Sequence, residues 1–366
     1  MKKQLNVMLF MLVLSGPAMI LTSCTTQKEE KVVAKNIIFL IGDGMGLQQM
    51  HAAYVVNGGS LAIERTSHVG LQKTHSANSY ITGSASSGTA MACGKKTKNG
   101  MVGVDSTLNE LESILKVAER YAMSTGLVST SGITHATPAS FIANQESRNN
   151  YEAIAADFLK TDIDVFIGGG LSHFTEREDG RDITAELVEN GYTVTTTLND
   201  CMNHSSGKLA AFTANGHNPS MLDGRGDMLP KATGKVIELL SQNQNGFFIM
   251  IEGSQIDWGG HANEQEYVIT ETLDFDEAVQ VAMDFAEQNG ETLVVVTADH
   301  ETGGMVVLNG NYENRTVETV FNSGGHTGIM MPVYAYGPGA ELFTGMYDNT
   351  DFKSKFMAAL GLEETE

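Results

Sequence analysis

Four apolar runs along the chain each stop at a cluster of polar residues. The runs are rich in Ile, Val, Leu and Phe and do not alternate with polar residues, which predicts β-strands covered on both faces. Carboxylate, imidazole or hydroxyl side chains follow each run within a few residues. The four segments are KNIIFLIGDGMG (35–46), GLVSTSGITHATPAS (126–140), GFFIMIEGSQIDWGGH (246–261) and ETLVVVTADHETGG (291–304).

Amphipathic segments between and after these runs predict helices. Apolar residues recur every three or four positions in LNELESILKVAERYAM (108–123) and in TETLDFDEAVQVAMDFAEQNG (270–290), where Gly290 is a residue type that often ends a helix. Residues 230–246 and 351–362 also predict helices, and DVFIGGG (164–170) predicts another strand with a tight turn. Alternating strands and helices indicate an α/β fold, a three-layer sandwich with a large, mostly parallel central sheet between helices.

The polar clusters are expected to converge, because parallel sheets bind ligands beyond the carboxyl ends of their strands. Carboxylate and imidazole groups without thiolates suit a catalytic Zn²⁺ site, and carboxylate and hydroxyl oxygens suit Mg²⁺. A dinucleotide-binding loop at GDGMG is disfavoured, because the GxGxxG spacing is missing. The candidate ligands from these clusters are Asp43, Glu252, Asp257, His261, Asp299, His300 and His326.

The stretch ITGSASSGTAMACG (81–94) carries three serines and two threonines among small residues. From its composition it could be a flexible linker, a helix of small residues, or the surroundings of a nucleophile. The residues alone do not distinguish Ser84 from Ser86 or Ser87 as that nucleophile.

Composition narrows the possible partners. The chain has 366 residues, enough for one large or two ordinary domains, and a formal net charge of −21. Such an acidic chain argues against binding nucleic acid, whose phosphates need Lys and Arg. Cys93 and Cys201 are expected to be unpaired thiols.

The N-terminus has the pattern of an export signal. Two lysines precede an apolar run that is short and interrupted by SGP, which disfavours a membrane span. The LTSC stretch resembles a bacterial lipobox, so we expect a lipoprotein signal peptide (1–23), lipidation on Cys24, a polar tether (24–35) and a catalytic domain (36–366). The lipid would hold the domain at a membrane, in the periplasm or at the cell surface.

Taken together, these motifs resemble the alkaline phosphatase family, in family order from KNIIFLIGDGMG to FMAALGL. The resemblance implies metal-dependent hydrolysis of phosphate monoesters to alcohol and inorganic phosphate. Aligned through TGSASSGTAMACGKKTKNGMVGVD (82–105), Ser84 is the implied nucleophile, which carries a phosphoserine intermediate, and Ser86, Ser87 and Thr89 pack the helix. A homodimer is expected from the family.

The resemblance also implies a complete ligand set for two Zn²⁺ and one Mg²⁺. Arg148 matches the phosphate-binding arginine, whose guanidinium can donate two parallel hydrogen bonds. The implied ligands are Asp257, His261 and His326 for the first zinc, Asp43, Asp299 and His300 for the second, and Asp43, Thr137 and Glu252 for magnesium.

Three positions depart from the pattern of other members. Gly83 stands where bacterial members often have Asp, so one aid to orienting Arg148 is missing. His135 occupies a position near magnesium that is Asp in some members, and Trp258 replaces Lys or His. The short segment 301–325 leaves no room for the large crown insertion of some relatives, which predicts a compact enzyme with an open site.

Two other functions compete with this interpretation. A phosphodiesterase or sulfatase would keep the fold and change the substrate, but the CxPxR-like context of a sulfatase is absent from the sequence. A surface lipoprotein that binds metal or phosphate without turnover would not need the hydroxyl of Ser84.

Overall fold

A ten-stranded sheet runs through residues 33–363, the part of the chain that the computed structural model describes. The strands are β1 (Asn36–Gly42), β2 (His68–Lys73), β3 (Ser124–Gly132), β4 (Val165–Gly169), β5 (Thr193–Thr195), β6 (Leu209–Phe212), β7 (Phe247–Gly253), β8 (Thr292–Thr297), β13 (Met331–Tyr336) and β14 (Gly345–Asp348). Their order is β14-β2-β13-β8-β1-β7-β3-β4-β6-β5, and β13 is antiparallel to both of its neighbours while the other pairs are parallel.

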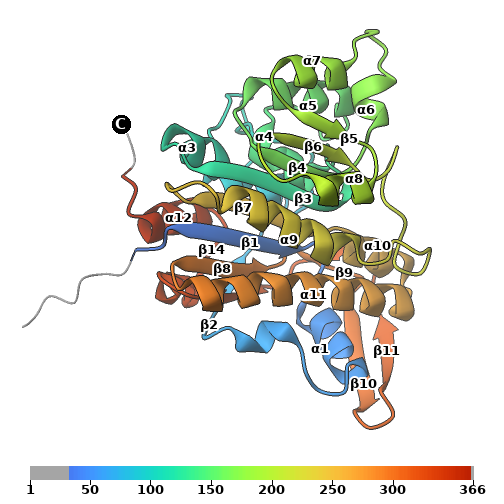
Figure 1. Cartoon of the computed structure of the whole chain (residues 1–366). Coiled ribbons are helices and arrows are strands. Elements are labelled where there is room, and N and C mark those ends of the chain that lie inside the picture. The colour runs from blue at the N-terminus through green and yellow to red at the C-terminus, as the bar shows by residue number, and fades with distance from the viewer. Residues whose placement is uncertain (1–32, 364–366) are drawn as a thin grey trace, which may run out of the picture. The chain divides into compact units, whose positions relative to one another are not determined.

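Helices cover both faces of this sheet (Figure 1). They are α1 (Leu47–Val56), α2 (Ser84–Cys93), α3 (Ile114–Arg120), α4 (Ala136–Ile142), α5 (Tyr151–Asp157), α6 (Ser172–Thr175), α7 (Ile183–Glu189), α8 (Leu198–Asn203), α9 (Met228–Leu240), α10 (Gln255–Ala262), α11 (Gln265–Asn289) and α12 (Asp351–Leu360). Three short 3₁₀ segments are η1 (Ala62–Arg65), η2 (Phe158–Lys160) and η3 (Ala340–Phe343).

The central strand β1 shows why its apolar run does not alternate. All of its residues are buried. Ile37 and Phe39 belong to one core, with side chains of α3, α4 and α12, and Ile38 and Leu40 belong to the other, with side chains of α1, α9 and α11. A strand buried on both faces favours apolar residues at successive positions, and the one polar side chain of β1, that of Asn36, donates to Thr292 Oγ1. The predicted three-layer sandwich with a mostly parallel sheet is therefore confirmed.

For two predicted helices, the ends expected from the sequence can be compared with those in the structure. The long helix α11 ends at Asn289, and Gly290 takes the left-handed conformation (φ 73°) that a C-cap glycine often adopts. The helix predicted over 108–123 is shorter, because α3 begins only at Ile114. The Ser113 side chain accepts a hydrogen bond from the Lys116 amide, and such a cap starts a helix.

A short hairpin lies between the candidate ligands His300 and His326 in the sequence. Strands β10 (Met305–Asn311) and β11 (Thr316–Phe321) form this hairpin, which projects beside α1 (Figure 1). Just before and after it, β9 (Glu301–Thr302) pairs with β12 (His326–Thr327). The pairing brings His326 back beside His300 without a large insertion.

Other expectations concern the cysteines and the N-terminus. Cys93 and Cys201 are buried and unpaired, as expected. Within residues 33–363, none of the helices has the length and apolar character that a membrane crossing requires. The predicted signal peptide (1–23) and Cys24 lie outside the described residues.

Candidate active site

Neighbouring strands deliver the predicted ligands to one edge of the sheet. Strands β8, β1, β7 and β3 are consecutive in the sheet. Asp43 follows β1, Glu252 lies near the end of β7, and Asp299 and His300 follow β8. Thr137 lies in α4, the helix that follows β3. The parallel arrangement therefore places these side chains at a common edge, as the pattern of apolar runs predicted.

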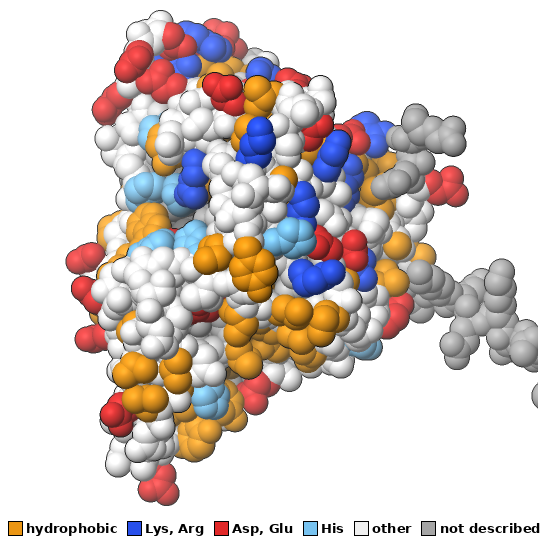
Figure 2. Space-filling model, turned by 180° about the vertical axis from the view of Figure 1, so that it is seen from behind, with side chains coloured by type: hydrophobic (Ala, Val, Ile, Leu, Met, Phe, Trp, Pro, Cys, Tyr) orange, Lys and Arg blue, Asp and Glu red, His pale blue; other side chains and the backbone are white. Residues whose placement is uncertain are grey.

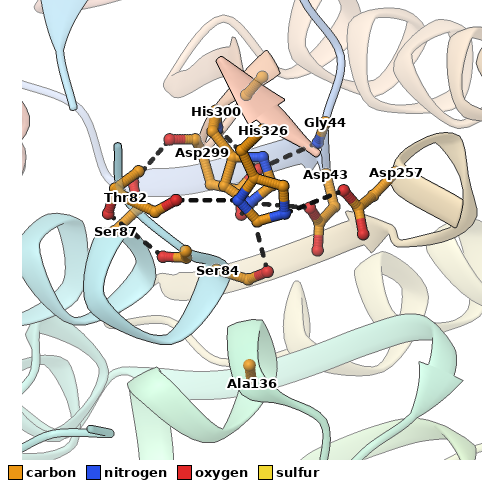
Figure 3. Close-up of polar contacts among 12 residues, drawn as sticks. Asp43, Gly44, Thr82, Ser84, Ser87, Ala136, Asp257, Asp299, His300 and His326 are labelled. Carbon is orange, nitrogen blue, oxygen red and sulfur yellow. Dashed lines mark hydrogen bonds and ion pairs between the residues drawn. The ribbon is translucent and has the colours of Figure 1, made fainter. Parts of the chain in front are cut away.

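Ser84 is the first residue of α2 and faces this edge (Figure 3). Its Oγ lies 3.4 Å from His300 Nε2, and Arg148 Nη1 donates a hydrogen bond to it at 3.5 Å. Gly83 before it is extended, so the helix begins at Ser84, beside the ligand cluster. A helix start is a favourable place for an anion, because its N–H groups have no partner within the helix.

The other serines of this helix make structural bonds instead. Ser86 Oγ donates to Asn99 Oδ1 at 2.7 Å, and Ser87 Oγ donates to the carbonyl of Asp299 at 2.8 Å. Their hydroxyls are therefore already engaged, while Ser84 lies between an imidazole and a guanidinium. The stretch that the sequence left open as linker, helix or nucleophile frame is a helix whose first residue points at the ligand cluster.

Three predicted ligands lie close enough to share one ion. His261 Nε2 is 3.2 Å from His326 Nε2, and the Oδ1 atom of Asp257 is 3.4 Å from the first and 3.5 Å from the second. Tetrahedral zinc with ligands at about 2.0–2.1 Å separates neighbouring ligand atoms by about 3.3 Å. The two imidazoles are also oriented for this, because their Nδ1 atoms donate to carbonyl oxygens, those of Gly324 and Thr82, both at 2.8 Å.

A second group is fully buried and surrounds His300. Its Nε2 atom lies 3.1 Å from Asp299 Oδ2 and 3.6 Å from Asp43 Oδ1. The other oxygen of Asp299 accepts hydrogen bonds from the amides of Gly44 and His300, at 3.1 and 2.9 Å. Figure 3 shows these side chains turned toward one another beside Asp257 and His326. Ligand atoms of His300, His326 and Asp257 also lie within 4.8 Å of one another, so the two groups adjoin.

Several buried oxygen atoms at this edge have no hydrogen-bond partner among residues 33–363. They include both carboxylate oxygens of Asp43, the hydroxyl of Thr137 and Oε1 of Glu252. The other oxygen of Glu252 accepts a hydrogen bond from Ser129 at 2.6 Å. Buried polar groups without partners are costly, so a set of oxygen atoms left free together fits a hard cation such as Mg²⁺.

The charge of the site also fits divalent ions. Burial, with the neighbouring carboxylates of Asp299 and Asp257, holds the pKa of Asp43 well above its usual range. Burial and Asp257 likewise raise the pKa of Asp299 to about 7. Carboxylates this crowded favour protonation unless positive charge compensates them. Bound cations would supply that charge, so the residues present fit the metals that the sequence predicted.

Arg148 is held by an imidazole. Its Nη2 atom donates to His135 Nε2 at 2.8 Å, so this nitrogen is unprotonated, because a guanidinium can only donate. Burial, and next the charge of Arg148, hold the pKa of His135 well below its usual range. The ring of His135 also packs edge-on against that of Trp258, with ring centroids 6.1 Å apart. The imidazole of His135 therefore fixes one end of the Arg148 guanidinium.

Sequence reasoning missed residues that support the ligands. Thr302 Oγ1 donates to Asp257 Oδ1 at 2.5 Å, and its position two residues after His300 was a signal. His217 lies on a loop and His173 in the short helix α6, and neither gave a comparable signal. His217 Nδ1 accepts a hydrogen bond from the amide of Gly132 at 2.9 Å, and His173 Nδ1 lies 2.6 Å from Thr134 Oγ1.

The fold and the site define an α/β protein that can hold divalent cations next to a serine at a helix start. Comparison with known proteins agrees. The family model "Alkaline phosphatase" matches residues 34–315. Alkaline phosphatase 3 of Bacillus subtilis is 33% identical over 89% of both chains, and alkaline phosphatase of Escherichia coli is 33% identical over 90% of this chain and 87% of its own.

Solved structures show the same relationship. The alkaline phosphatase of the Antarctic bacterium TAB5 superposes with a TM-score of 0.87 at 42% identity, covering 91% of this chain and 100% of that chain. A histidine-to-aspartate mutant of that enzyme, with Mg bound in its M3 site, gives a TM-score of 0.86 at 39% identity, covering 92% and 100%. The chain belongs to the alkaline phosphatase family. Its activity is that of an alkaline phosphatase, EC 3.1.3.1.

Proposed function

We propose that this alkaline phosphatase transfers the phosphoryl group of a monoester to Ser84, with two Zn²⁺ and one Mg²⁺ in the site. The observation that carries the proposal is the place of Ser84 Oγ, 3.4 Å from His300 Nε2 and 3.5 Å from Arg148 Nη1. One hydroxyl therefore lies between the ligand groups and a fixed positive charge. A nucleophile in such a place is already oriented for attack.

Three ligand sets would hold the ions. The set for the first zinc includes His261, which is exposed. The set for the second zinc is buried around His300, and the set for magnesium shares Asp43 with it. Bound there, the ions would act as Lewis acids that stabilise charge on the attacking and leaving oxygens. The Mg-containing TAB5 mutant supports the choice of magnesium at the third set. The sets are Asp257, His261 and His326, then Asp43, Asp299 and His300, then Asp43, Thr137 and Glu252.

The side chains of the protein account for the two displacements at phosphorus. The Ser84 hydroxyl gives its proton to solvent as its oxygen bonds to phosphorus and the ester P–O bond breaks, and the departing alkoxide takes a proton from water to leave as the alcohol. Water then attacks the phosphoserine, the Ser84–phosphorus bond breaks, the Ser84 oxygen takes up a proton from that water, and inorganic phosphate leaves. Arg148 donates hydrogen bonds to non-bridging oxygens in both steps, which favours the dianionic monoester over a diester.

Three substrates and two variants test this proposal. We expect the purified protein to hydrolyse p-nitrophenyl phosphate far faster than bis(p-nitrophenyl) phosphate or p-nitrophenyl sulfate. Ser84→Ala should lower kcat by a factor of about 10³ or more, since the covalent route is lost. Ser86→Ala, which removes a neighbouring hydroxyl with its own partner in Asn99, should retain most activity.

Two outcomes would contradict the proposal. A preference for the diester would indicate a phosphodiesterase. Phosphate and metal binding that is the same in wild type and Ser84→Ala, without turnover in either, would indicate a binding protein. Elemental analysis of the purified protein, with activity assays after chelation and add-back of Zn²⁺ or Mg²⁺, tests the metal assignment.

We also propose that residues 36–366 form the catalytic domain of an exported lipoprotein, anchored through Cys24. The LTSC stretch after a basic and apolar segment supports this proposal. The lipid would hold the enzyme at a membrane of the periplasm or cell surface. Cys24→Ala should move the activity from the membrane fraction to the soluble fraction of the cells that produce it, and unchanged fractionation would contradict the proposal.

A homodimer is the third proposal, and an exposed apolar surface supports it. Figure 2 shows hydrophobic side chains gathered on one face beside histidines. Met346 pairs with Leu71 across β14 and β2, and Tyr80 lies against Gly328. The surface-exposed apolar residues of these segments are Val69, Leu71, Tyr80, Ile81, Ile329, Met330 and Met346.

Light scattering tests the dimer directly. Wild type should have the mass of two chains, and Leu71→Glu should have the mass of one, because a buried charge opposes association. Leu308→Glu is a matched control, since Leu308 is also exposed but lies on the β10–β11 hairpin. A monomeric wild type would contradict the proposal.

A further inference from the structure

The loop of residues 216–227 is fastened to the body of the protein by buried charge. The Arg225 side chain is only 1% exposed, and its Nη2 atom donates to Asp274 at 2.7 Å and to Glu271. The amide of Met221, in the same loop, donates to Glu271 Oε1 at 2.8 Å. Both acids belong to α11, so the loop is attached to a long helix at two points.

A second attachment joins the loop to the strand end that carries the site. Gln255 is buried in α10, and its side-chain amide donates to the carbonyls of Asn218 in the loop and Thr130 in β3, at 2.9 and 3.1 Å. The hydroxyl of Tyr267 donates to the other end of this amide at 2.8 Å. A side chain with all of these partners has one orientation, so the loop has a fixed place relative to β3.

His217 is the side chain that this fixed loop presents. Its Nδ1 atom accepts the amide hydrogen of Gly132 at 2.9 Å, which sets both the tautomer and the angle of the ring. The ring packs edge-on against Trp258, with centroids 4.9 Å apart, and against His135, with centroids 5.3 Å apart. The histidine is itself exposed, so its position does not serve to fill a core.

The turn between β3 and α4 is thus held from two sides. His217 holds Gly132 at its start, and His173 lies 2.6 Å from Thr134 Oγ1 while stacking on Tyr151 at 4.7 Å. His135, the last residue of this turn, is the partner of Arg148 at 2.8 Å. The orientation of the guanidinium therefore depends on the packing of His135.

We propose that His217 is a positioning residue that orients Arg148 through His135. The inference rests on the proposed function, in which Arg148 binds the phosphoryl oxygens. Gly83 offers no carboxylate to the guanidinium, so the ring of His135 is its anchor and the ring of His217 keeps that anchor in place. Removing the His217 imidazole opens space beside His135 and frees the amide of Gly132, and Arg148 then loses its fixed direction.

Kinetics of substituted holoenzymes test the inference. In zinc- and magnesium-loaded enzyme, His217→Ala should raise KM for p-nitrophenyl phosphate and the inhibition constant of inorganic phosphate by on the order of tenfold, the size typical of outer partners in metal sites. Kcat should change less. His217→Asn should restore most of the loss, because its side-chain oxygen can accept the Gly132 amide. His204→Ala is the matched control on a distant loop and should behave like wild type.

A double-mutant cycle with Arg148→Ala separates positioning from direct contact. If His217 acts through Arg148, His217→Ala should have almost no further effect in the Arg148→Ala enzyme. Equal effects of His217→Ala in both backgrounds would overturn the inference, as would wild-type kinetics of His217→Ala. These results leave the proposed function intact, whereas a wild-type enzyme without monoesterase activity would overturn both. Thermal unfolding of each variant shows whether a lost activity comes from misfolding.

Discussion

At the scale of single residues, the site depends on which atom each side chain turns inward. His261 and His326 each donate from Nδ1 to a backbone carbonyl, so both Nε2 atoms keep a lone pair for a cation. Asp257 is fixed in the same way by the hydroxyl of Thr302 at 2.5 Å. These outer bonds cost nothing at the moment of metal binding, because the folded chain has already made them.

Thr302→Val tests this support. Valine has a similar shape but leaves Asp257 Oδ1 without its donor, so the affinity of the first zinc set should fall by about 10–100-fold. Competition with a chromogenic chelator measures this affinity. Thr319→Val is the control, because Thr319 on β11 donates to Gln265 in α11 and not to a ligand. Equal zinc affinity in wild type and Thr302→Val would show that this hydrogen bond does not support the site.

At the scale of elements, the site depends on the close approach of α2 and α4. These helices carry Ser84 and Thr137, and they meet at Gly88, where an added Cβ would lie 2.8 Å from Ser140 Oγ. Ser140 is itself bonded to the carbonyl of Ala85 in α2, at 3.1 Å. Small residues in α2 therefore set the distance between the serine and the proposed magnesium ligands.

Gly88→Val should separate the two helices. The extra carbons overpack a filled interface, so the free energy of unfolding should fall by about 1–3 kcal/mol, and kcat/KM should fall with it. Urea unfolding and steady-state kinetics measure both. Gly234→Ala is the control, because a Cβ there meets only Val281, at 3.8 Å, and alanine should stabilise α9 by about 0.5–1 kcal/mol. A Gly88→Val enzyme that is as stable and active as wild type would show that the site does not depend on the close approach of α2 and α4.

At the scale of the whole molecule, the sequence predicted those features that a continuous run of residues determines, such as the buried strands and the polar residues at their ends. The apolar runs marked β1, β3, β7 and β8, and their polar ends marked most of the ligand candidates. The choice of Ser84 over its neighbours needed the family resemblance, because Ser86 differs from it only in its tertiary partners. The role of His217 was out of reach, since it depends on Arg225 meeting acids more than forty residues away. The start of α3 was missed because Ser113 caps the helix and so cuts an apolar pattern short.

Metal removal should weaken the whole fold. The buried carboxylates of Asp43, Asp299 and Glu252 come from three strand ends, and without cations they crowd negative charge in the centre of the sheet edge. At free zinc about 1,000 times its Kd, each site adds about 4 kcal/mol to the free energy of unfolding. Chelation should therefore lower Tm and abolish activity, and Zn²⁺ with Mg²⁺ should restore both. A Tm that chelation does not change would argue against ions at this edge.

The proposed mechanism depends on a covalent phosphoserine, and this intermediate can be trapped. The metal-loaded enzyme is mixed with a phosphate monoester, quenched in acid and digested, and the phosphorylated peptide is located by mass spectrometry. We expect phosphate on Ser84 in wild type and none on the same peptide from Ser84→Ala. Phosphate on Ser86 or Ser87, or rapid turnover with Ser84 replaced by alanine, would contradict it.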